Sequence, residues 1–307
     1  MWVNKMAKTK NSKPLSKIIR EKNHCYVMLI PFLVSFIIFM VIPVFASVVL
    51  SFTDFNLLQT PNFVGFDNYM RLLLNDDIFI ISLKNTFVFA VLIGPIGYIA
   101  SFVVAWFINE LGPKMRSLVT LIMYAPALVG NAYIIWSYIF ASDSRGLLNT
   151  IVKSLGISDA PILWTTDPKY NFTVCVIVSI WMSFGTGFLS FVASFKTLDP
   201  SFFEAAAIDG LKNRWQELFY VTFPQMGPQL LFGAVMSISS AFGVGAIPAA
   251  LTGNPSTNYS THTLLLHISD YGTTRFEMGY ASATAVILFI IMVITLKVIN
   301  KLLSKFN

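Results

Sequence analysis

Residues 200–228 read PSFFEAAAIDGLKNRWQELFYVTFPQMGP and lie between two long apolar stretches. Ser201 and Glu204 stand three residues apart, which predicts a capping box at the start of a helix. Pro200 stands just before that helix, and Gly210 is a natural residue to end it. The predicted helix has only about two turns, too few to be stable alone in water. It therefore requires a surface on which to pack.

A second short helix is predicted directly after the glycine. Asn213 is a favourable N-cap residue, and the helix is expected to run through Trp215, Leu218 and Phe219 and to end before Pro224. A helix, a glycine corner and another helix form a compact knob that fits a groove on a cytoplasmic partner. The alternative is a plain connecting loop.

The apolar stretches on either side of this segment belong to a larger set. Of the 307 residues, 55% are hydrophobic and 12% are charged, whereas soluble domains carry about 25% charged residues. A helix needs roughly 20 apolar residues to cross the hydrocarbon core. Because no alternating barrel pattern is present, we expect an all-α polytopic membrane protein with six transmembrane helices. The spans are predicted near residues 26–51, 84–108, 117–140, 172–195, 228–251 and 277–299.

The distribution of Lys and Arg predicts the topology. These residues concentrate in the two tails, near residues 114–116 and in the segment 196–227, which places all of these in the cytoplasm. We expect a basic N-terminal tail at 1–25, a six-helix membrane domain at 26–300 and a C-terminal tail at 301–307. The first apolar stretch is too long for a signal peptide and is expected to be retained.

Two kinds of chemistry are not indicated. Every Asp and Glu can be placed in a loop or a tail, whereas ion-driven carriers depend on ionisable groups near mid-membrane. The energy for any transport is therefore expected to come from another subunit. His24, His262 and His267 are scattered, so we predict no catalytic residue and no metal site, and interpret the last two as ordinary outer-loop histidines.

Short helices are expected in two outer loops. NFVGFDNYMRLLLNDD, within 52–83, is typical of an amphipathic segment at the membrane interface, and GLLNTIVKSLGI lies within 141–171. The last outer loop is rich in Gly, Thr, Asn and Ser, which predicts only partly regular structure.

A polar stripe is predicted in the fourth span. Ser179, Ser183, Thr186 and Ser190 recur at helical spacing, with Trp181 nearby. Hydroxyls and an aromatic face in a mostly apolar cavity suit a sugar. Small residues also mediate helix packing in membranes, so the stripe has two interpretations. The fifth span carries a similar row, formed by Gly233, Ser237, Ser240 and Gly243.

The segment EAAAIDGLKNRWQELFYVTFP resembles the EAA signature of the membrane subunits of binding-protein-dependent ABC importers. Glu204, Ala205, Ala206, Gly210 and Pro224 stand at the positions of that motif. NFVGFDNYMRLL, YAPALVGNAYIIWSYIF, LTGNP and FEMGYASA look like the sugar-permease branch, typified by the larger membrane subunit of the maltose transporter. The resemblance covers nearly the whole chain.

The resemblance implies the type I ABC importer permease fold in a bacterial plasma membrane, with both termini cytoplasmic. It implies a second homologous permease subunit, two ATP-binding subunits that hold the ATP and Mg, an extracellular solute-binding protein, a carbohydrate substrate and surrounding lipid, but no nucleic acid and no enzyme activity in this chain. The residues it assigns to ATPase coupling are Phe202, Phe203, Glu204, Ala205, Ala206, Ile208, Asp209, Gly210, Arg214 and Pro224.

The family's sugar contacts correspond to Ser179, Met182, Ser183, Thr186, Ser237, Ala241 and Val244, to which the two polar rows add Trp181 and Ser240. Several of these residues lack the amide or aromatic character found in the maltose subunit, so the sugar stays open. Alternatives are a sugar phosphodiester or a modified sugar as solute, an energy-independent carrier, and a membrane scaffold or sensor that transports nothing.

Overall fold

The computed structural model describes residues 23–303, which form helices joined by loops. Within that range, the β-structure consists of the isolated bridge between Thr53 and Phe63. The prediction of an all-α membrane protein is confirmed. The chain divides into two units, Met1–Val49 and Leu50–Asn307, and each is described by itself.

The first unit contains one apolar helical span. It consists of α2 (Asn23–Phe36), a π turn, η1 (Ile37–Val41), and the start of α3 (Ile42–Leu50). The apolar part, Val27–Leu50, is 24 residues long, enough to cross a membrane. The π turn ends shortly before Pro43, whose ring nitrogen cannot donate a helical hydrogen bond. The predicted first span is therefore one helix with a local irregularity.

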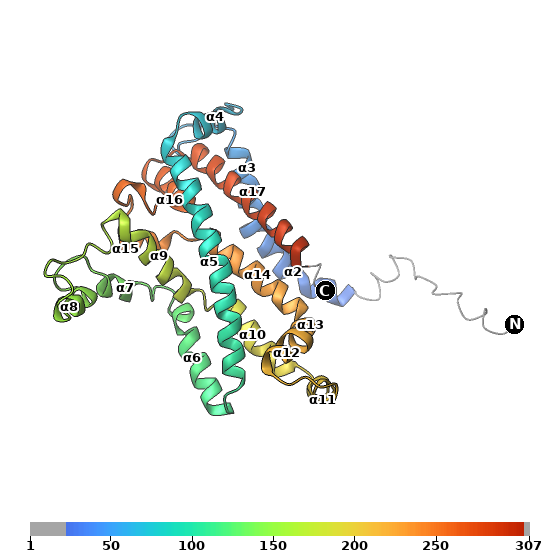
Figure 1. The fold of residues 1–307 in the computed structure, drawn as a ribbon. Coiled ribbons are helices and arrows are strands. Elements are labelled where there is room, and N and C mark those ends of the chain that lie inside the picture. The colour runs from blue at the N-terminus through green and yellow to red at the C-terminus, as the bar shows by residue number, and fades with distance from the viewer. Residues whose placement is uncertain (1–22, 304–307) are drawn as a thin grey trace. The chain divides into compact units, whose positions relative to one another are not determined.

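The second unit is built on long helices (Figure 1). These are α5 (Asp77–Asn109), α6 (Pro113–Val129), α9 (Pro168–Met182), α10 (Thr186–Thr197), α14 (Gly227–Phe242) and α17 (Met278–Leu303). Between them lie the shorter elements α4 (Asp67–Leu74), α7 (Ile134–Ile139), α8 (Leu147–Ser154), α11 (Pro200–Ile208), α12 (Arg214–Glu217), the π turn η2 (Leu218–Thr222), α13 (Phe223–Gln225), α15 (Ala246–Thr252), η3 (Thr257–Tyr259), α16 (Leu264–Ser269) and the π turn η4 (Asp270–Thr274).

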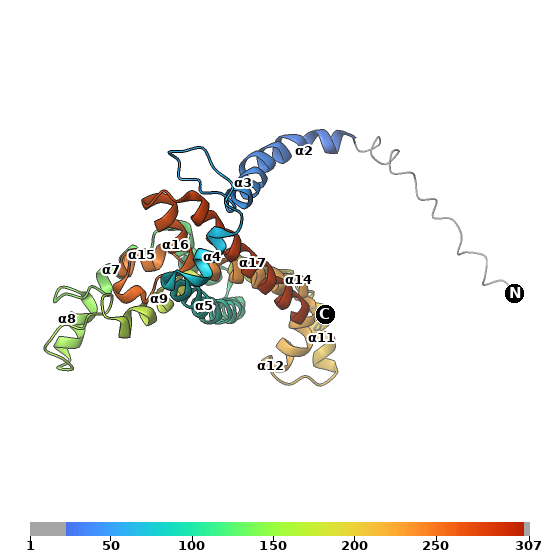
Figure 2. The ribbon, with the colours of Figure 1, turned by 90° about the horizontal axis from the view of Figure 1, so that it is seen from above.

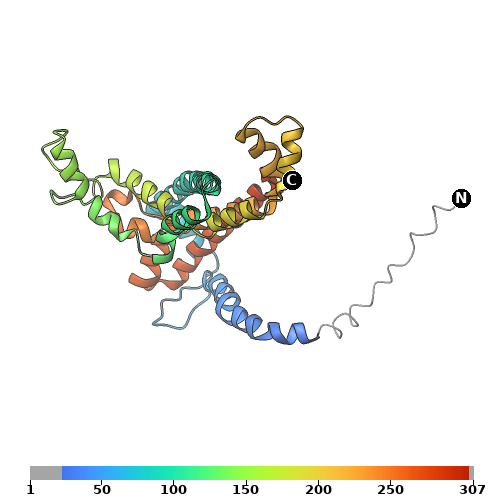
Figure 3. The same ribbon diagram turned by 90° about the horizontal axis from the view of Figure 1, so that it is seen from below.

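The helix α5 is the axis of this unit, because α10 and α14 pack on it and on each other. Figure 1 shows α4 and α16 at one end of α5 and the α11–α12 pair at the other. Views from above and below place α7 and α8 on one side of α5 and α11 and α12 on the opposite side (Figures 2 and 3). A single long helix thus reaches both ends of the unit.

Two apolar cores follow the length of α5. The first lies towards α16 and includes Phe79, Phe89, Val178, Leu264 and Tyr280. The second lies towards α11 and includes Phe102, Phe188, Phe191, Phe195 and Leu218. Since lipid supplies no hydrophobic drive between helices, close packing of these side chains must hold the helices together.

The six predicted spans are not all continuous helices. Within residues 23–303, four helices are long and apolar enough to cross a membrane, and α14 with α15 makes a fifth, bent by 41°. The predicted span at 117–140 is instead divided into α6 and α7, because Gly130 adopts a left-handed φ of 70° that ends α6. The fourth span is also interrupted, between Met182 and Thr186.

The predicted short helices in the two outer loops correspond to α4 and α8. The last outer loop is partly regular, with η3, α16 and η4. Of the predicted tails, residues 1–22 and 304–307 lie outside the described part of the chain.

The start of α17 provides a test of the packing in this unit. The Gly279 N–H donates to the carbonyl of Phe55 at 2.9 Å, and a Cβ at Gly279 would collide with the carbonyl oxygen of Thr53. We expect Gly279→Ala to lower the free energy of unfolding by about 1–3 kcal/mol, as overpacking does. Gly272→Ala is the matched control, because its Cβ would meet Ala281 at an ordinary 3.5 Å. Thermal unfolding in detergent measures both, and equal stability of the two variants would contradict the prediction.

Candidate functional site

The helix α11 has well-defined ends. The Asp199 side chain is its N-cap and accepts a hydrogen bond from the Ser201 N–H at 2.9 Å, with Pro200 in the first turn. The predicted capping box of Ser201 and Glu204 is therefore wrong, because the fixed φ of Pro200 suits the first helical position and moves the cap back by two residues. At the other end, Gly210 has a φ of 93°, as expected for a glycine terminator.

The hydrogen bonds after α11 form a Schellman motif. The Gly210 N–H donates to the Ala207 carbonyl at 3.2 Å, and the Leu211 N–H donates to the Ala206 carbonyl at 3.1 Å. These two bonds satisfy carbonyls that the helix end leaves free. The corner between the two short helices is thus closed by the backbone itself, and glycine is required because of its positive φ.

The second helix begins as predicted but does not end as predicted. The Asn213 side chain accepts from the Gln216 N–H at 2.9 Å and so caps α12. The expected end before Pro224 is wrong, since α12 continues through the π turn η2 into α13, which contains Pro224 in its first turn. The π turn changes the hydrogen-bond register just before Pro224, whose ring nitrogen cannot donate.

The coupling loop, defined as residues 196–227, exposes several large apolar side chains. Ala206 is 9% exposed and faces the protein, whereas Ile208 is 87%, Phe202 55% and Trp215 59% exposed. Glu204 is exposed on the same helix. A narrow helix with outward apolar anchors is typical of an element that inserts into a groove on a partner.

Arg214 joins the coupling loop to the end of α5. Its guanidinium donates to the Glu217 carboxylate at 2.8 Å and to the Glu110 carboxylate at 3.2 Å. The hydrogen bond to Glu217 and the charge of Glu110 raise the pKa of Arg214. These residues border a cavity of about 410 Å³ that Phe203 and Glu204 also line.

A second cavity, of about 250 Å³, lies between α5, α10 and α14. Among the predicted path residues, it is lined by Met182, Ser183, Thr186, Ser237 and Ser240. Further hydroxyls come from Tyr98, Ser101 and Ser239, which the sequence analysis did not select. We call this the hydroxyl cavity. It offers many hydrogen-bonding groups and no charged side chain among its lining residues.

The remaining predicted path residues lie elsewhere. Ser179, on α9, is 4% exposed and lies in the packed interior. The Trp181 ring packs edge-on against Trp136 at 5.4 Å. Ala241 lies beside Gly94, and the Val244 carbonyl accepts a hydrogen bond from the Thr263 hydroxyl. The predicted serine stripe is not one helix face, because α9 ends at Met182 and α10 begins at Thr186. The break turns Ser183 and Thr186 towards the cavity and leaves Ser179 in the packed interior.

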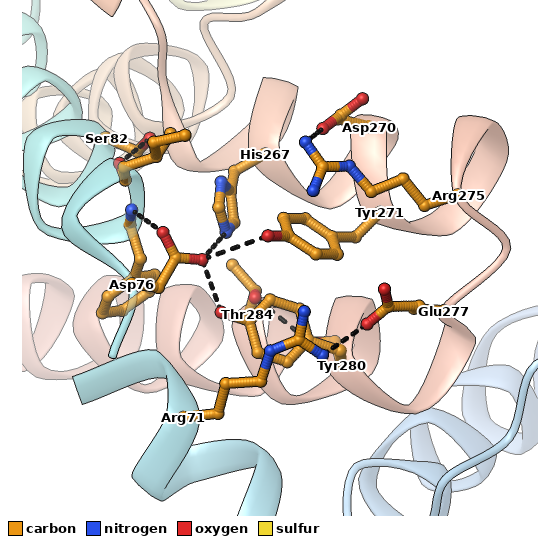
Figure 4. A network of polar contacts seen from close by, with 12 residues as sticks. Arg71, Asp76, Ser82, His267, Asp270, Tyr271, Arg275, Glu277, Tyr280 and Thr284 are labelled. Atoms are coloured by element: carbon orange, nitrogen blue, oxygen red, sulfur yellow. Dashed lines mark hydrogen bonds and ion pairs between the residues drawn. The ribbon is translucent and has the colours of Figure 1, made fainter. Parts of the chain in front are cut away.

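A cluster that the sequence analysis missed lies at the other end of α5 (Figure 4). The Asp76 carboxylate accepts hydrogen bonds from the Tyr280 hydroxyl at 2.5 Å and the Tyr271 hydroxyl at 3.4 Å. It also caps α5 by accepting from the Phe79 N–H, and His267 Nε2 lies 3.3 Å away. The side chains of Asp76 and His267 are 8% and 1% exposed. One carboxylate thereby ties α5, α16, η4 and α17 together.

Two arginines cover this cluster. Arg71 donates to Glu277 and stacks over the Tyr280 ring at 4.3 Å, and Arg275 donates to Asp270 at 2.8 Å and stacks over the Tyr271 ring at 4.3 Å. Cation–π contacts of this kind stabilise by about 0.5–2 kcal/mol each, depending on exposure. We call these residues together the Asp76 cluster. Within residues 23–303 no group of three His, Cys, Asp or Glu side chains is arranged to bind a metal.

Burial controls the ionisation of the groups around Asp76. It lowers the pKa of His262 to about 4 and lowers the pKa of His267 as well. Burial also opposes the charge of Asp76, but hydrogen bonds from Tyr280 and the Phe79 N–H hold the pKa of Asp76 below its ordinary value. At neutral pH the buried Asp76 carboxylate therefore lies beside a neutral His267 imidazole, and the nearby His262 is neutral as well.

The lowered histidine pKa values predict a loss of stability in acid. An unfolded histidine binds a proton near pH 6.5, whereas His262 in the folded chain does so only near pH 4. The unfolded state thus binds more protons between these values, and the free energy of unfolding falls as the pH falls through this window. We expect the unfolding temperature to drop between pH 6.5 and pH 4, and to drop less for His262→Gln. An equally steep profile for the variant would contradict this assignment.

Comparison with known proteins identifies the family that shares this architecture. Residues 28–306 match the family model described as "Binding-protein-dependent transport system inner membrane component". The chain is 34% identical over 288 residues to the probable ABC transporter permease protein YesP of Bacillus subtilis, covering 92% of this chain and 91% of that protein. It is 28% identical over 286 residues to the arabinooligosaccharides transport system permease protein AraP of the same organism, covering 92% and 89%.

The lactose transport system permease protein LacF of Rhizobium radiobacter is 30% identical over 268 residues, covering 84% of this chain and 85% of that one. A solved bacterial ABC transporter involved in the import of alginate superposes with a TM-score of 0.77 at 23% identity, over 95% of this chain and 99% of that chain, and thus shares the fold. The chain therefore belongs to the inner membrane components of binding-protein-dependent transport systems and is a permease subunit of such an importer.

Proposed function

We propose that this permease forms half of the transmembrane path for a sugar or an oligosaccharide. The observation that carries the proposal is the hydroxyl cavity, which combines Ser, Thr and Tyr hydroxyls with apolar side chains and glycines. Sugars present hydroxyl rims and apolar C–H faces, which such a lining matches. The names of AraP and LacF, which refer to arabinooligosaccharides and lactose, support a carbohydrate. A sugar phosphodiester is less favoured, because no Lys or Arg lines this cavity.

The energy for transport enters through the coupling loop. We infer that α11 inserts into a cleft of an ATP-binding subunit, which holds the ATP and Mg, and that this chain itself catalyses nothing. The exposed side chains of Phe202, Ile208 and Trp215 supply the apolar anchors for that contact. The complete importer then contains a second homologous permease, two ATP-binding subunits and an extracellular solute-binding protein. The coupling loop and both termini lie in the cytoplasm, in agreement with the distribution of Lys and Arg.

The identity of the solute is tested by purifying the importer with its partner subunits. The solute-binding protein of the complex is screened by calorimetry against arabinooligosaccharides, lactose and alginate oligosaccharides, with glycerol phosphodiesters as the non-sugar arm. A carbohydrate that binds and also stimulates ATP hydrolysis by the complex supports the proposal. Binding and stimulation by a phosphodiester alone would overturn it.

Coupling through α11 predicts the behaviour of a double variant. Glu204→Lys reverses the exposed charge of α11, and Gly210→Ala strains the left-handed residue that closes the Schellman motif. We expect the complex to hydrolyse ATP while solute uptake per ATP falls about tenfold or more. Lys212→Gln, on the same exposed loop, serves as the control and keeps normal uptake. Normal uptake per ATP in the double variant would contradict coupling through this loop.

The hydroxyl cavity predicts the effect of filling it. Ser240 lines the cavity and is exposed, so Ser240→Leu removes a hydroxyl and places an apolar side chain in a space of about 250 Å³. We expect uptake to fall about tenfold or more, because the buried hydroxyls of the solute lose partners. Phe232→Leu, on the same helix but outside the cavity lining, should transport normally. Uptake by Ser240→Leu at the level of this control would place the solute path elsewhere.

A further inference from the structure

One ridge of α5 connects the hydroxyl cavity to the coupling loop. It consists of Gly94, Tyr98, Phe102, Trp106 and Glu110, each four residues after the last, and we call it the α5 ridge. Residues four apart lie above one another on one face of a helix. We propose that the α5 ridge transmits displacement of the coupling loop to the solute cavity, and that Trp106 and Glu110 are positioning residues for coupling. The inference rests on the proposed function of α11.

The cytoplasmic end of the ridge holds the second half of the coupling loop. Glu110 accepts a hydrogen bond from Arg214 at 3.2 Å, and the Trp106 ring packs edge-on against Trp215 at 5.0 Å. The ion pair is half-exposed, so its contribution to stability is small. The aromatic pair and the ion pair together fix the orientation of α12 against the end of α5. Any movement of α12 therefore acts on the last two turns of α5.

Phe102, in the middle of the ridge, contacts residues at both ends of the coupling loop. Phe102 is 5% exposed, and its ring lies 5.5 Å from Phe195, which precedes the loop, and 5.2 Å from Phe223, which follows α12. The residue just before the coupling loop and a residue near its end thus pack against one side chain of α5. Close-packed interiors transmit displacement because they do not compress, so the two ends of the loop cannot shift without shifting Phe102.

The far end of the ridge reaches the cavity walls. Phe191 lies 5.5 Å from Phe102 and 5.6 Å from Tyr98, and Tyr98 lines the hydroxyl cavity. The Tyr98 hydroxyl donates to the Leu230 carbonyl at 3.3 Å, and the Ser237 hydroxyl donates to the Gly94 carbonyl at 2.9 Å. The ridge therefore contacts both α10 and α14, which form the other walls of the cavity.

The remaining faces of α5 provide the control for this argument. Phe107 follows Trp106 directly, but its ring stacks on the Trp106 ring at 5.4 Å, so it cannot serve as an independent control. Ile99 follows Tyr98 directly, and its side chain is 58% exposed. If coupling depends on the ridge, a change at Ile99 should leave it intact. Ile99→Ala removes a large apolar side chain on the same helix without removing a ring or an ion pair of the ridge.

The experiment follows movement at the cavity while docking of α11 is monitored separately. In the intact complex, with Cys25→Ser and Cys175→Ala in the background, Ser240→Cys reports cavity access through its rate of labelling by a maleimide. Mg-ATP with vanadate is the probe that drives the change. In parallel, Ile208→Cys, at an exposed position of α11, is cross-linked to the ATP-binding subunit. Each measurement is made for Glu110→Gln, Trp106→Phe, Trp106→Leu and the control Ile99→Ala.

We expect nucleotide to change the labelling rate of Ser240→Cys in the background chain and in Ile99→Ala. In Trp106→Leu and Glu110→Gln the nucleotide effect should shrink by about fivefold or more, the low end of typical coupling between sites. Trp106→Phe keeps an aromatic ring and should restore most of the effect. Cross-linking of α11 to the ATP-binding subunit should persist in all four variants.

Three results would count against these inferences, and they differ from one another. A full nucleotide effect in both Trp106→Leu and Glu110→Gln would overturn transmission through the α5 ridge. Loss of cross-linking in those variants alone would show that the residues serve docking of α11, which also overturns it. Failure of Ile208→Cys to cross-link in the background chain, while the complex hydrolyses ATP, would overturn the proposed function of α11 itself.

Discussion

Packing of the coupling loop against α5 is the constraint on which the rest of the structure depends. The helix α11 has only nine residues, and a helix of that length does not persist alone in water. Its two ends are fixed by Asp199 and by the Schellman motif at Gly210. Phe195, just before the loop, and Phe223, near its end, then pack against Phe102. This support holds the exposed apolar side chains of α11 in fixed positions, as the proposed docking to an ATP-binding subunit requires.

The helix α5 also connects the other features of the permease described above. Along α5 lie the Asp76 cluster at one end, the hydroxyl cavity near Tyr98, and the Glu110–Arg214 contact at the other end. The Asp76 cluster ties the first turn of α5 to α16 and α17 through buried hydrogen bonds, so that end is anchored. The opposite end contacts the coupling loop, which we propose moves with an ATP-binding subunit. A long helix fixed at one end and pushed at the other would alter the cavity between them.

Much of the fold was predictable from local patterns. Long apolar stretches predicted the membrane helices, because lipid leaves the backbone no other partner than itself. The break in the third span is not predictable from hydropathy, since Gly130 ends α6 through its left-handed φ. The cap of α11 is Asp199 and not Ser201, because Pro200 occupies the first turn. The helix that begins with α12 does not end before Pro224 but continues through it after a π turn.

The site was predictable where its residues are neighbours in the chain. The exposed anchors Phe202 and Ile208 follow from one short motif. The hydroxyl cavity was predicted only in part, because the break after Met182 turns Ser183 and Thr186 away from the direction of Ser179. The Asp76 cluster joins residues about two hundred positions apart, and no periodicity links them. The spacing of Tyr98, Phe102, Trp106 and Glu110 was visible in the sequence, but its meaning required the positions of Phe195, Trp215 and Phe223.

Amide hydrogen exchange tests the central claim most directly. The complete importer and the permease pair without its ATP-binding subunits are compared over residues 200–211, with residues 147–154 of α8 as an internal reference. Our account predicts that the amides of α11 exchange more slowly when the ATP-binding subunits are present, while those of α8 do not change. Unchanged exchange across α11 in a complex that hydrolyses ATP and transports its solute would contradict the account.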